Sequence, residues 1–371
     1  MNDEAAYWSL PLARAGSVDR LSIARSETIF CDRTQALSAL NQTASRIWSV
    51  LEASGSCGAA AADLVELGAS APDARAFVAS AASDWLKKGY FFPAQAWAPI
   101  GEQRYQVGPL ALEIRYFGDA DPKSGEEVLG CFPAATQLPT MSLDVRGHRD
   151  HDFIFLGGAP IGMHPRADTP AIIKALVTEA LCAKCDSGFL MHGALLSSGG
   201  KTVVLAGQPG AGKTTLTLAL AASGLEYRGD DIVLVDDRGF ALGMPFAAAT
   251  KEGAWPLLRT YVPGLMDLPV RKRSDGKHVR YVRPEHAPLA PQRIDAVLLL
   301  SRQAGVSAGV ASIDPVEALC FLIDGSFSHR GKIERAQLGA FASAVGAARC
   351  GRLTYSELEP AIAAVKAFVD G

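Results

Sequence analysis

A strand, a glycine-rich loop and a helix are expected to follow one another between residues 202 and 222. The run TVVLA is apolar, and GQPGAGKT directly after it fits the pattern G-x-x-x-x-G-K-[ST] in full. Glycines let the loop backbone curl so that several N–H groups point at one anion, and the N-terminus of the following helix adds partial positive charge. The sequence therefore predicts an α/β fold with a phosphate-binding loop at the end of this strand.

The loop has the composition of a Walker A nucleotide site. Lys213 would reach the β- and γ-phosphates and Thr214 would offer its hydroxyl to a metal ion, so ATP and Mg²⁺ are the predicted ligands. The residues predicted to hold the nucleotide are Gly207, Gln208, Gly210, Ala211, Gly212, Lys213, Thr214 and Thr215.

Two acidic pairs flank the next apolar strand, in the stretch GDDIVLVDD. Asp236 and Asp237 follow the strand, where P-loop ATPases usually place an acidic magnesium ligand. Asp230 and Asp231 precede the strand, which is unusual. The residue pattern alone leaves both pairs open as metal ligands.

The stretch from His192 to Asp231 resembles the core of HPr kinase/phosphorylase and of the HPr-kinase-related proteins. It carries the three markers of that family in order: a His-Gly that opens a strand, a P-loop about fifteen residues later, and an Asp-Asp pair after the P-loop helix. The resemblance implies a fold like the nucleotide domain of phosphoenolpyruvate carboxykinases. It is sharp over this core and vaguer over residues 100–371.

This resemblance implies a phosphotransferase that acts on seryl or threonyl hydroxyls. It implies Asp230 as the general base, His192 beside it to hold its orientation and charge, Asp231 with Thr214 as metal ligands, and Lys213 on the phosphates. From the residues alone, the alternative for His192 is a strand histidine packed on the core, and the alternative for Asp230 is a residue of a helix-to-strand turn. A glycine-containing signature downstream in HPr kinases is missing, so HPr is not the expected substrate.

Residues 18–93 predict a winged-helix-like module of two strands, near 21–25 and 28–32, followed by three helices. Asn41 is a plausible N-cap of the first helix, and Gly68 closes the second. Apolar residues at helical spacing predict the buried faces of the first and third helices: Ala44, Ile47, Trp48 and Leu51, then Ala74, Phe77, Val78, Ala81 and Trp85.

The same module resembles PqqD, a domain that recognises leader peptides of ribosomally made, modified peptides. LNQTA followed by Ile-Trp and the closing DWLKKGYFF carry the resemblance. It implies that residues 18–93 bind the leader of a precursor peptide as an added strand, in a groove between the edge strand near Thr28–Asp32 and the helix near Ala74–Trp85. A purely structural cap on the P-loop domain is the alternative.

Charge and apolar patterning argue against several partners. Residues 1–95 carry eight basic and ten acidic side chains, the wrong sign for binding a nucleic-acid backbone. The chain starts with no secretory signal and no run approaches 18 apolar residues, so neither a membrane nor export is expected. Seven scattered cysteines favour reduced thiols in a cytoplasm, and the lone pair Cys182/Cys185 favours buried thiols over zinc. HPr kinases form hexamers, so a homo-oligomer is one expected state.

The remaining segments give coarser predictions. Strands are expected within 111–117, 141–145 and 153–157, a helix at about 169–186 and a hairpin within 188–207. HRD at 148–150 lacks the asparagine that a kinase catalytic loop needs five residues later. Residues 259–283 carry a net charge of +5 and predict either a basic lid over phosphates or a solvated loop. Helices are expected at 314–324, 336–347 and 359–369.

Together with these two resemblances, the sequence predicts a PqqD-like peptide-binding domain at 1–95 and an HPr-kinase-like P-loop domain at 100–371, with its core at 186–240. The predicted function is an ATP-dependent kinase that phosphorylates a Ser or Thr hydroxyl of a precursor peptide held by its leader. Two alternatives stay open: a nucleotide-gated leader-binding protein without phosphotransfer, and a kinase of a small metabolite.

Overall fold

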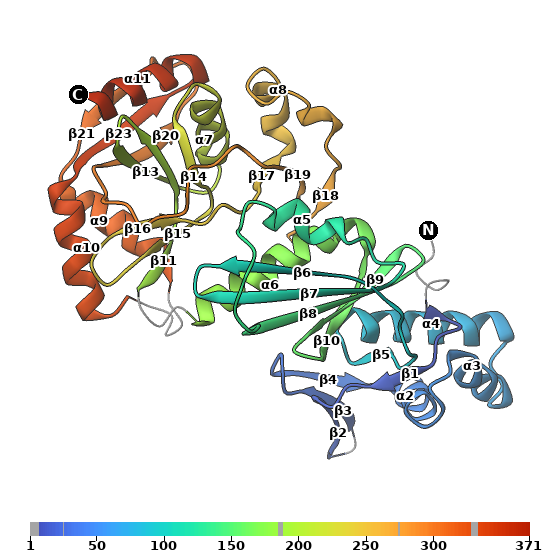
Figure 1. Ribbon diagram of the computed structural model, residues 1–371. Coiled ribbons are helices and arrows are strands. Elements are labelled where there is room, and N and C mark those ends of the chain that lie inside the picture. The colour runs from blue at the N-terminus through green and yellow to red at the C-terminus, as the bar shows by residue number, and fades with distance from the viewer. Residues whose placement is uncertain (1–6, 25, 185–187, 274, 328–332) are drawn as a thin grey trace. The chain divides into compact units, whose positions relative to one another are not determined.

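The structure is a computed structural model that describes residues 7–24, 26–184, 188–273, 275–327 and 333–371. It is a mixed α/β fold with several sheets (Figure 1). The chain forms two compact units. The first unit comprises Met1–Arg104, Leu112–Pro122 and Pro139–Thr169, and the second comprises Tyr105–Ala111, Lys123–Leu138 and Pro170–Gly371.

The first unit contains the three predicted N-terminal helices, α2 (Gln42–Ser54), α3 (Cys57–Glu66) and α4 (Ala71–Lys87). The Asn41 side chain accepts a hydrogen bond from the Ala44 N–H and caps α2, as predicted. One detail of the predicted faces is wrong: Phe77 is 51% exposed, and Ala82 and Leu86 lie in the core beside the other apolar residues of α4.

From residue 18 onward, three short strands precede these helices, where two were predicted. They are β2 (Val18–Ile23), β3 (Ser26–Cys31) and β4 (Ala36–Leu40), in the spatial order β2-β3-β4. The sequence ALSAL of β4 has few β-branched or aromatic residues, so it gave little strand signal. The strand that was predicted to be an open edge, β3, is central and is paired on both sides, so that prediction is wrong.

Aromatic side chains form the centre of the first unit. Trp48 is fully buried and makes edge-on contacts with Trp85 and Phe91, at ring-centroid distances of 4.9 and 4.7 Å. The same apolar core includes Phe153 and Met163 from the sheet that follows. Apolar packing therefore continues past residue 95, and the division into domains drawn there from the sequence stays a prediction.

The second sheet of this part of the chain has five strands in the order β10-β9-β8-β7-β6. The three predicted strands lie within β7, β8 and β9. HRD occupies the β8–β9 turn, where Arg149 has φ 55°, so it has the geometry of a hairpin and not of a kinase loop. The strands are β6 (Pro99–Val107), β7 (Leu110–Gly118), β8 (Met141–His148), β9 (His151–Leu156) and β10 (Ala159–Pro165), and β1 (Leu12–Arg14) pairs with β5 (Phe91–Pro93) nearby.

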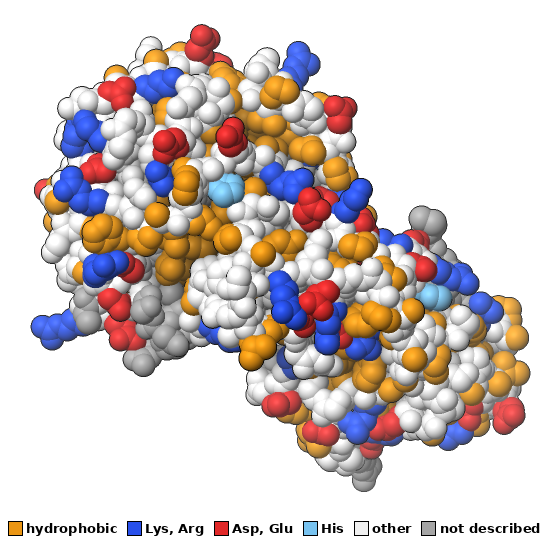
Figure 2. All heavy atoms as spheres, in the orientation of Figure 1, with side chains coloured by type: hydrophobic (Ala, Val, Ile, Leu, Met, Phe, Trp, Pro, Cys, Tyr) orange, Lys and Arg blue, Asp and Glu red, His pale blue; other side chains and the backbone are white. Residues whose placement is uncertain are grey.

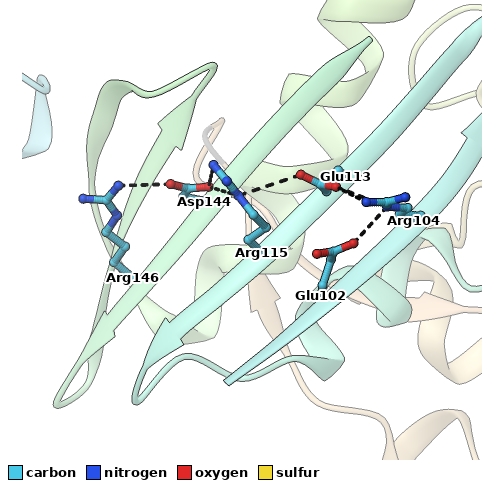
Figure 3. A network of polar contacts seen from close by, with 6 residues as sticks. All are labelled: Glu102, Arg104, Glu113, Arg115, Asp144 and Arg146. Atoms are coloured by element: carbon cyan, nitrogen blue, oxygen red, sulfur yellow. Dashed lines mark hydrogen bonds and ion pairs between the residues drawn. The ribbon is translucent and has the colours of Figure 1, made fainter. Parts of the chain in front are cut away.

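A row of alternating charges crosses one face of this sheet (Figure 3). It runs through Glu102, Arg104, Glu113, Arg115, Asp144 and Arg146. Asp144 is the most buried member, at 5% side-chain exposure, and contacts the guanidinium groups of Arg115 at 2.6 Å and Arg146 at 3.0 Å. Glu102, at the far end, is 48% exposed and contacts only Arg104 among the residues drawn.

We expect Asp144→Ala to destabilise the first unit by about 1–3 kcal/mol, because it leaves two guanidinium groups without their shared buried partner. Glu102→Ala is the matched control and should cost about 0.5 kcal/mol or less, since exposed ion pairs contribute little. Urea unfolding followed by tryptophan fluorescence measures the difference, since four of the five tryptophans lie in the first unit. Equal losses from both substitutions would contradict this assignment.

The second unit is built on a six-stranded sheet in the order β14-β12-β13-β20-β23-β21. Its central strands β13, β20 and β23 are parallel. Helices α7 and α11 pack on one face of the sheet, and α9 and α10 contribute to the core on the other. The strands are β12 (Ala194–Ser198), β13 (Lys201–Gly207), β14 (Glu226–Gly229), β20 (Ala296–Arg302), β21 (Gly309–Ser312) and β23 (Arg349–Tyr355), and the helices are α7 (Lys213–Ala222), α9 (Pro315–Asp324), α10 (Arg335–Ala347) and α11 (Leu358–Asp370).

The predicted hairpin is formed by β12 and β13, which turn through Gly199 and Gly200, both at positive φ. The apolar run before it splits at Gly193, because β11 (Phe189–His192) belongs to a second sheet of order β16-β15-β11-β22. Helix α6 (Thr169–Lys184) was predicted; Cys185, the second residue of the CxxC pair, lies outside the described residues. The other strands of this sheet are β15 (Ile232–Val235), β16 (Ala241–Gly243) and β22 (Ser326–Phe327).

Two stretches of the basic segment 259–283 are strands β18 and β19 of a three-stranded sheet with the order β17-β19-β18. Several of its charges have partners: Arg271 pairs with Glu127 at 2.6 Å, and the Arg280 guanidinium stacks 4.6 Å from the Trp255 ring centroid. These contacts favour a structural role for those two residues over a lid. The elements here are α5 (Lys123–Leu129), β17 (Ala248–Lys251), α8 (Trp255–Leu258), β18 (Arg271–Lys272) and β19 (His278–Val282).

Side chains of both charges are interspersed over the face of the molecule seen in Figure 2. Among the helices of the described ranges, none is both long and apolar enough to cross a lipid bilayer.

Candidate phosphate-binding site

The glycine-rich loop joins the end of β13 to the start of α7, as the sequence predicted. Gly210 and Gly212 have φ values of 91° and 84°, which L side chains rarely adopt. A Cβ on Gly212 would lie 2.5 Å from the hydroxyl oxygen of Tyr355. That hydroxyl donates to the Ala211 carbonyl at 2.8 Å, so the end of β23 holds the loop in place.

A cavity of about 280 Å³ opens over this loop. Three cationic side chains line it, from Lys213, Lys251 and Arg302, and its described lining includes no carboxylate. Gly207, Arg302 and Tyr355 end the three parallel strands, so loop and cations gather at the carboxyl edge of the sheet, where α/β folds bind ligands. The cavity is therefore suited to a polyanion.

Most of the predicted loop residues line this cavity. Gly207 and Ala211 do not: Gly207 borders a neighbouring cavity, and the Ala211 carbonyl faces Tyr355. The lining loop residues are Gln208, Gly210, Gly212, Lys213, Thr214 and Thr215. The first N–H groups of α7 have no partner within the helix and are available to an anion here.

His192 ends β11 and connects the loop lysine to the acidic pair. Its Nε2 lies 2.6 Å from the Lys213 Nζ, and its Nδ1 lies 2.9 Å from the Asp231 carbonyl oxygen and 3.2 Å from the Asp231 Oδ1. The predicted partner of His192 was Asp230. The structure places it beside Asp231 instead, because β11 and β15 pair with His192 opposite Ile232.

Asp230 is buried, with 1% of its surface exposed. Its Oδ2 accepts a hydrogen bond of 2.6 Å from the Thr214 hydroxyl, and its Oδ1 has no hydrogen-bond partner among the described residues. Burial raises the pKa of Asp230, against the effect of the nearby Lys213. Burial also lowers the pKa of Lys213, against the effect of the two aspartates.

Asp231 is the accessible member of the pair, with 34% of its side chain exposed. Its φ of 83° is uncommon for a residue other than glycine, a feature that often marks functional sites. Its Oδ2 lies 3.3 Å from the Lys174 Nζ. Burial acts to raise the pKa of Asp231, but Lys174 and His192 outweigh it and hold the pKa well below its usual range.

The alternative acidic pair lies at the other end of β15. At about 3.3 Å per residue, Asp236 is roughly 16 Å along the strand from Asp231. Its carboxylate accepts hydrogen bonds from the N–H groups of Arg238 and Phe240, which closes the turn into β16. The structure therefore assigns Asp236 to a turn and brings Asp230 and Asp231 to the phosphate loop.

Sequence reasoning missed four side chains around this site: Lys174, Lys251, Arg302 and Tyr355. Arg302 and Tyr355 had a usable signal, since each ends an apolar parallel strand of the sheet that carries the loop. Lys174 had none, because a single lysine on an amphipathic helix is normally solvated. It is 7% exposed and its Nζ donates to the Ala247 carbonyl at 3.3 Å.

Comparison with known proteins gives a weak structural likeness. No family model matches the chain, and no curated protein matches it. Among solved structures, the chain is similar to the Hpr(Ser) kinase/phosphatase from Coxiella burnetii, at 9% sequence identity and a TM-score of 0.22, with 48% of this chain and 95% of that chain covered. At that TM-score the likeness is weak.

Proposed function

We propose that the second unit is an ATP-dependent kinase that transfers the γ-phosphoryl group to a Ser or Thr hydroxyl of a peptide. One observation carries the proposal: Lys213, His192 and Asp231 form a continuous chain of polar contacts that leads from the phosphate loop to a partly exposed carboxylate. A cation for the phosphates and a carboxylate for the hydroxyl proton are two of the groups that kinases use in phosphoryl transfer to an alcohol.

The residues present fit ATP and Mg²⁺. The cationic cavity matches a triphosphate, and the unpaired buried Oδ1 of Asp230 together with the Thr214 hydroxyl offers the oxygen ligands that Mg²⁺ prefers. Bound there, Mg²⁺ would neutralise charge on the β- and γ-phosphates. Lys213 would leave His192 for a phosphate oxygen, since an anion is a stronger partner for a buried ammonium than an imidazole is.

The greater exposure of Asp231 makes it the better candidate for the base. A general base has to come within hydrogen-bond reach of the acceptor hydroxyl, and the Asp230 carboxylate is buried against Thr214. We therefore assign proton acceptance to Asp231 and metal binding to Asp230 with Thr214, the reverse of the roles implied by the family resemblance.

Tracing where the label of γ-labelled ATP is transferred tests this proposal against its alternatives. The full-length protein is incubated with labelled ATP, Mg²⁺ and a library of synthetic Ser- and Thr-containing peptides, followed by mass spectrometry. Label on peptides supports the kinase. Label found only in free phosphate would favour the nucleotide-gated binder, and label on an added small metabolite alone would favour the metabolite kinase.

We propose further that the first unit binds the substrate peptide by its leader, as in PqqD-like domains. Support comes from the open edge of β4, which pairs only with β3 among the described strands. A cavity of about 340 Å³ lies where β4 meets the start of α2, lined by Arg20, Leu40, Asn41 and Ser45 among others. Leu37 of this edge strand is 57% exposed. Its side chain lies on the face of β4 opposite to that of Ser38.

An extended peptide added to β4 would present alternate side chains to these two faces. The groove differs from the one expected from the sequence. The α4 residues Ala74, Val78 and Trp85 are committed to the core, and β3 has no free edge. The helix beside the proposed groove is therefore α2.

We expect Leu37→Asp to weaken leader binding by about 10- to 100-fold, the loss that corresponds to burying one leucine side chain. Ile23→Asp is the matched control: it lies on β2, at the opposite edge, and is 49% exposed. Fluorescence anisotropy with a peptide selected on the full-length protein from a random phage library measures both. A larger effect at Ile23 would place the peptide on β2 instead.

A further inference from the structure

A second cavity, of about 320 Å³, lies between one face of α6 and the strands β17 and β19. The α6 residues that line it recur at helical spacing, so they form a single wall. The opposite wall comes from the small sheet and from the residue before β15. The lining residues are Ala171, Lys174, Ala175, Thr178, Glu179, Cys182, Asp231, Ala249, Arg273 and Tyr281.

This cavity and the phosphate cavity share one lining residue, and a contact between Asp231 and His192 connects them. Asp231 lines the second cavity, while His192, which it contacts, lines the first. Ala249 lines both cavities. A group bound in the second cavity therefore approaches the same carboxylate that connects through His192 to Lys213.

We propose that this second cavity is the acceptor site, where the hydroxyl to be phosphorylated binds. The inference rests on the proposed kinase function and adds the place and the chemistry of the acceptor. Nucleotide phosphates would favour the first cavity, whose charged lining is cationic. The second has two cationic and two acidic side chains, Lys174 and Arg273 against Asp231 and Glu179, so its charges balance.

Size and polarity narrow the acceptor class. The cavity holds the volume of roughly ten water molecules, at the lower end of the range for ligand pockets. Its neutral lining is mostly small, with three alanines, Thr178 and Cys182. These features fit an uncharged peptide segment in which a Ser or Thr has small neighbours, and they disfavour bulky or highly charged acceptors.

In this arrangement the acceptor oxygen attacks the γ-phosphorus from the side of Asp231. A new O–P bond forms, the bond between the β–γ bridging oxygen and the γ-phosphorus breaks, and ADP leaves with that electron pair. The hydroxyl proton passes to the Asp231 carboxylate. Lys174 positions this carboxylate through its 3.3 Å contact with Oδ2, and it is fixed by the Ala247 carbonyl and by the rings of Phe246 and Tyr281.

A steric block tests the site without touching any group with a chemical role. Ala175 is exposed on α6 and lines the cavity, so Ala175→Trp would fill it. Ala183→Trp is the matched control: it is exposed on the same helix and is not among the lining residues. Peptide phosphorylation is measured as kcat/KM with labelled ATP and the Ser/Thr peptide library, and MgATP binding is measured separately by calorimetry.

We expect Ala175→Trp to lower kcat/KM for peptides by about 100-fold, because a displaced acceptor loses its alignment with the phosphorus. MgATP affinity should stay within twofold, and Ala183→Trp should match the wild type in both measurements. Equal transfer by the two variants would overturn the acceptor site and leave the kinase function standing. If the wild type labels no peptide, the kinase function fails, and the acceptor site fails with it.

Discussion

Replacing Lys213 by Ala is expected to lower the rate of phosphoryl transfer by about 100- to 1,000-fold. Lys213 is the one cation of the cavity that the loop itself supplies, and only 8% of it is exposed. A preorganised charge in such a place is worth far more to the transition state than it would be in water. The measurement is single-turnover transfer of labelled phosphate to peptide at saturating MgATP.

Lys251→Ala is the matched control for this prediction. Lys251 lines the same cavity but is exposed to solvent, so water screens its charge and the rate should fall by about tenfold or less. A Lys213→Ala enzyme within a few-fold of the wild type would show that the glycine-rich loop does not hold the transferred phosphate. An equal loss from both variants would indicate general attraction of the nucleotide and no specific role for Lys213.

The loop and its flanking elements could be predicted from sequence because each part carries a local signal. The apolar run, the fixed glycine positions and the following helix are all read within about 20 residues. The hairpin before the loop and the capped helix α2 are predictable for the same reason: Gly199, Gly200 and Asn41 act on their own neighbours.

The missed features depend on pairing between distant segments. β4 has weak strand propensity and forms because β3 offers it a partner. Lys174 contacts Asp231 only because α6 packs beside the start of β15. No local sequence pattern predicts that packing. The predicted partner of His192 was Asp230 and the observed one is Asp231, a difference that follows from the strand register. A shift of one residue in register turns every side chain of a strand to the other face.

Asp231→Asn is expected to lower kcat by about 100- to 10,000-fold while MgATP binding is kept, because it removes the base and preserves the shape of the side chain. Asparagine tolerates positive φ better than most residues, so the backbone at φ 83° should not be strained by the change. The pKa of Asp231 is held below its usual range, so the carboxylate stays ionised through neutral pH. Its protonation should therefore cause no loss of rate between pH 8 and pH 6.

Asp230→Asn distinguishes the roles of the two aspartates, because it makes the same change in charge one residue away from Asp231. Asp230 is assigned to the metal with Thr214, so this variant should need more Mg²⁺ for half-maximal rate and recover part of its activity when Mg²⁺ is raised. Transfer is measured across a Mg²⁺ titration for both variants. If Asp230→Asn abolishes transfer at saturating Mg²⁺ while Asp231→Asn retains it, Asp230 is the base. The Asp231 carboxylate would then serve only to hold His192 beside the loop lysine.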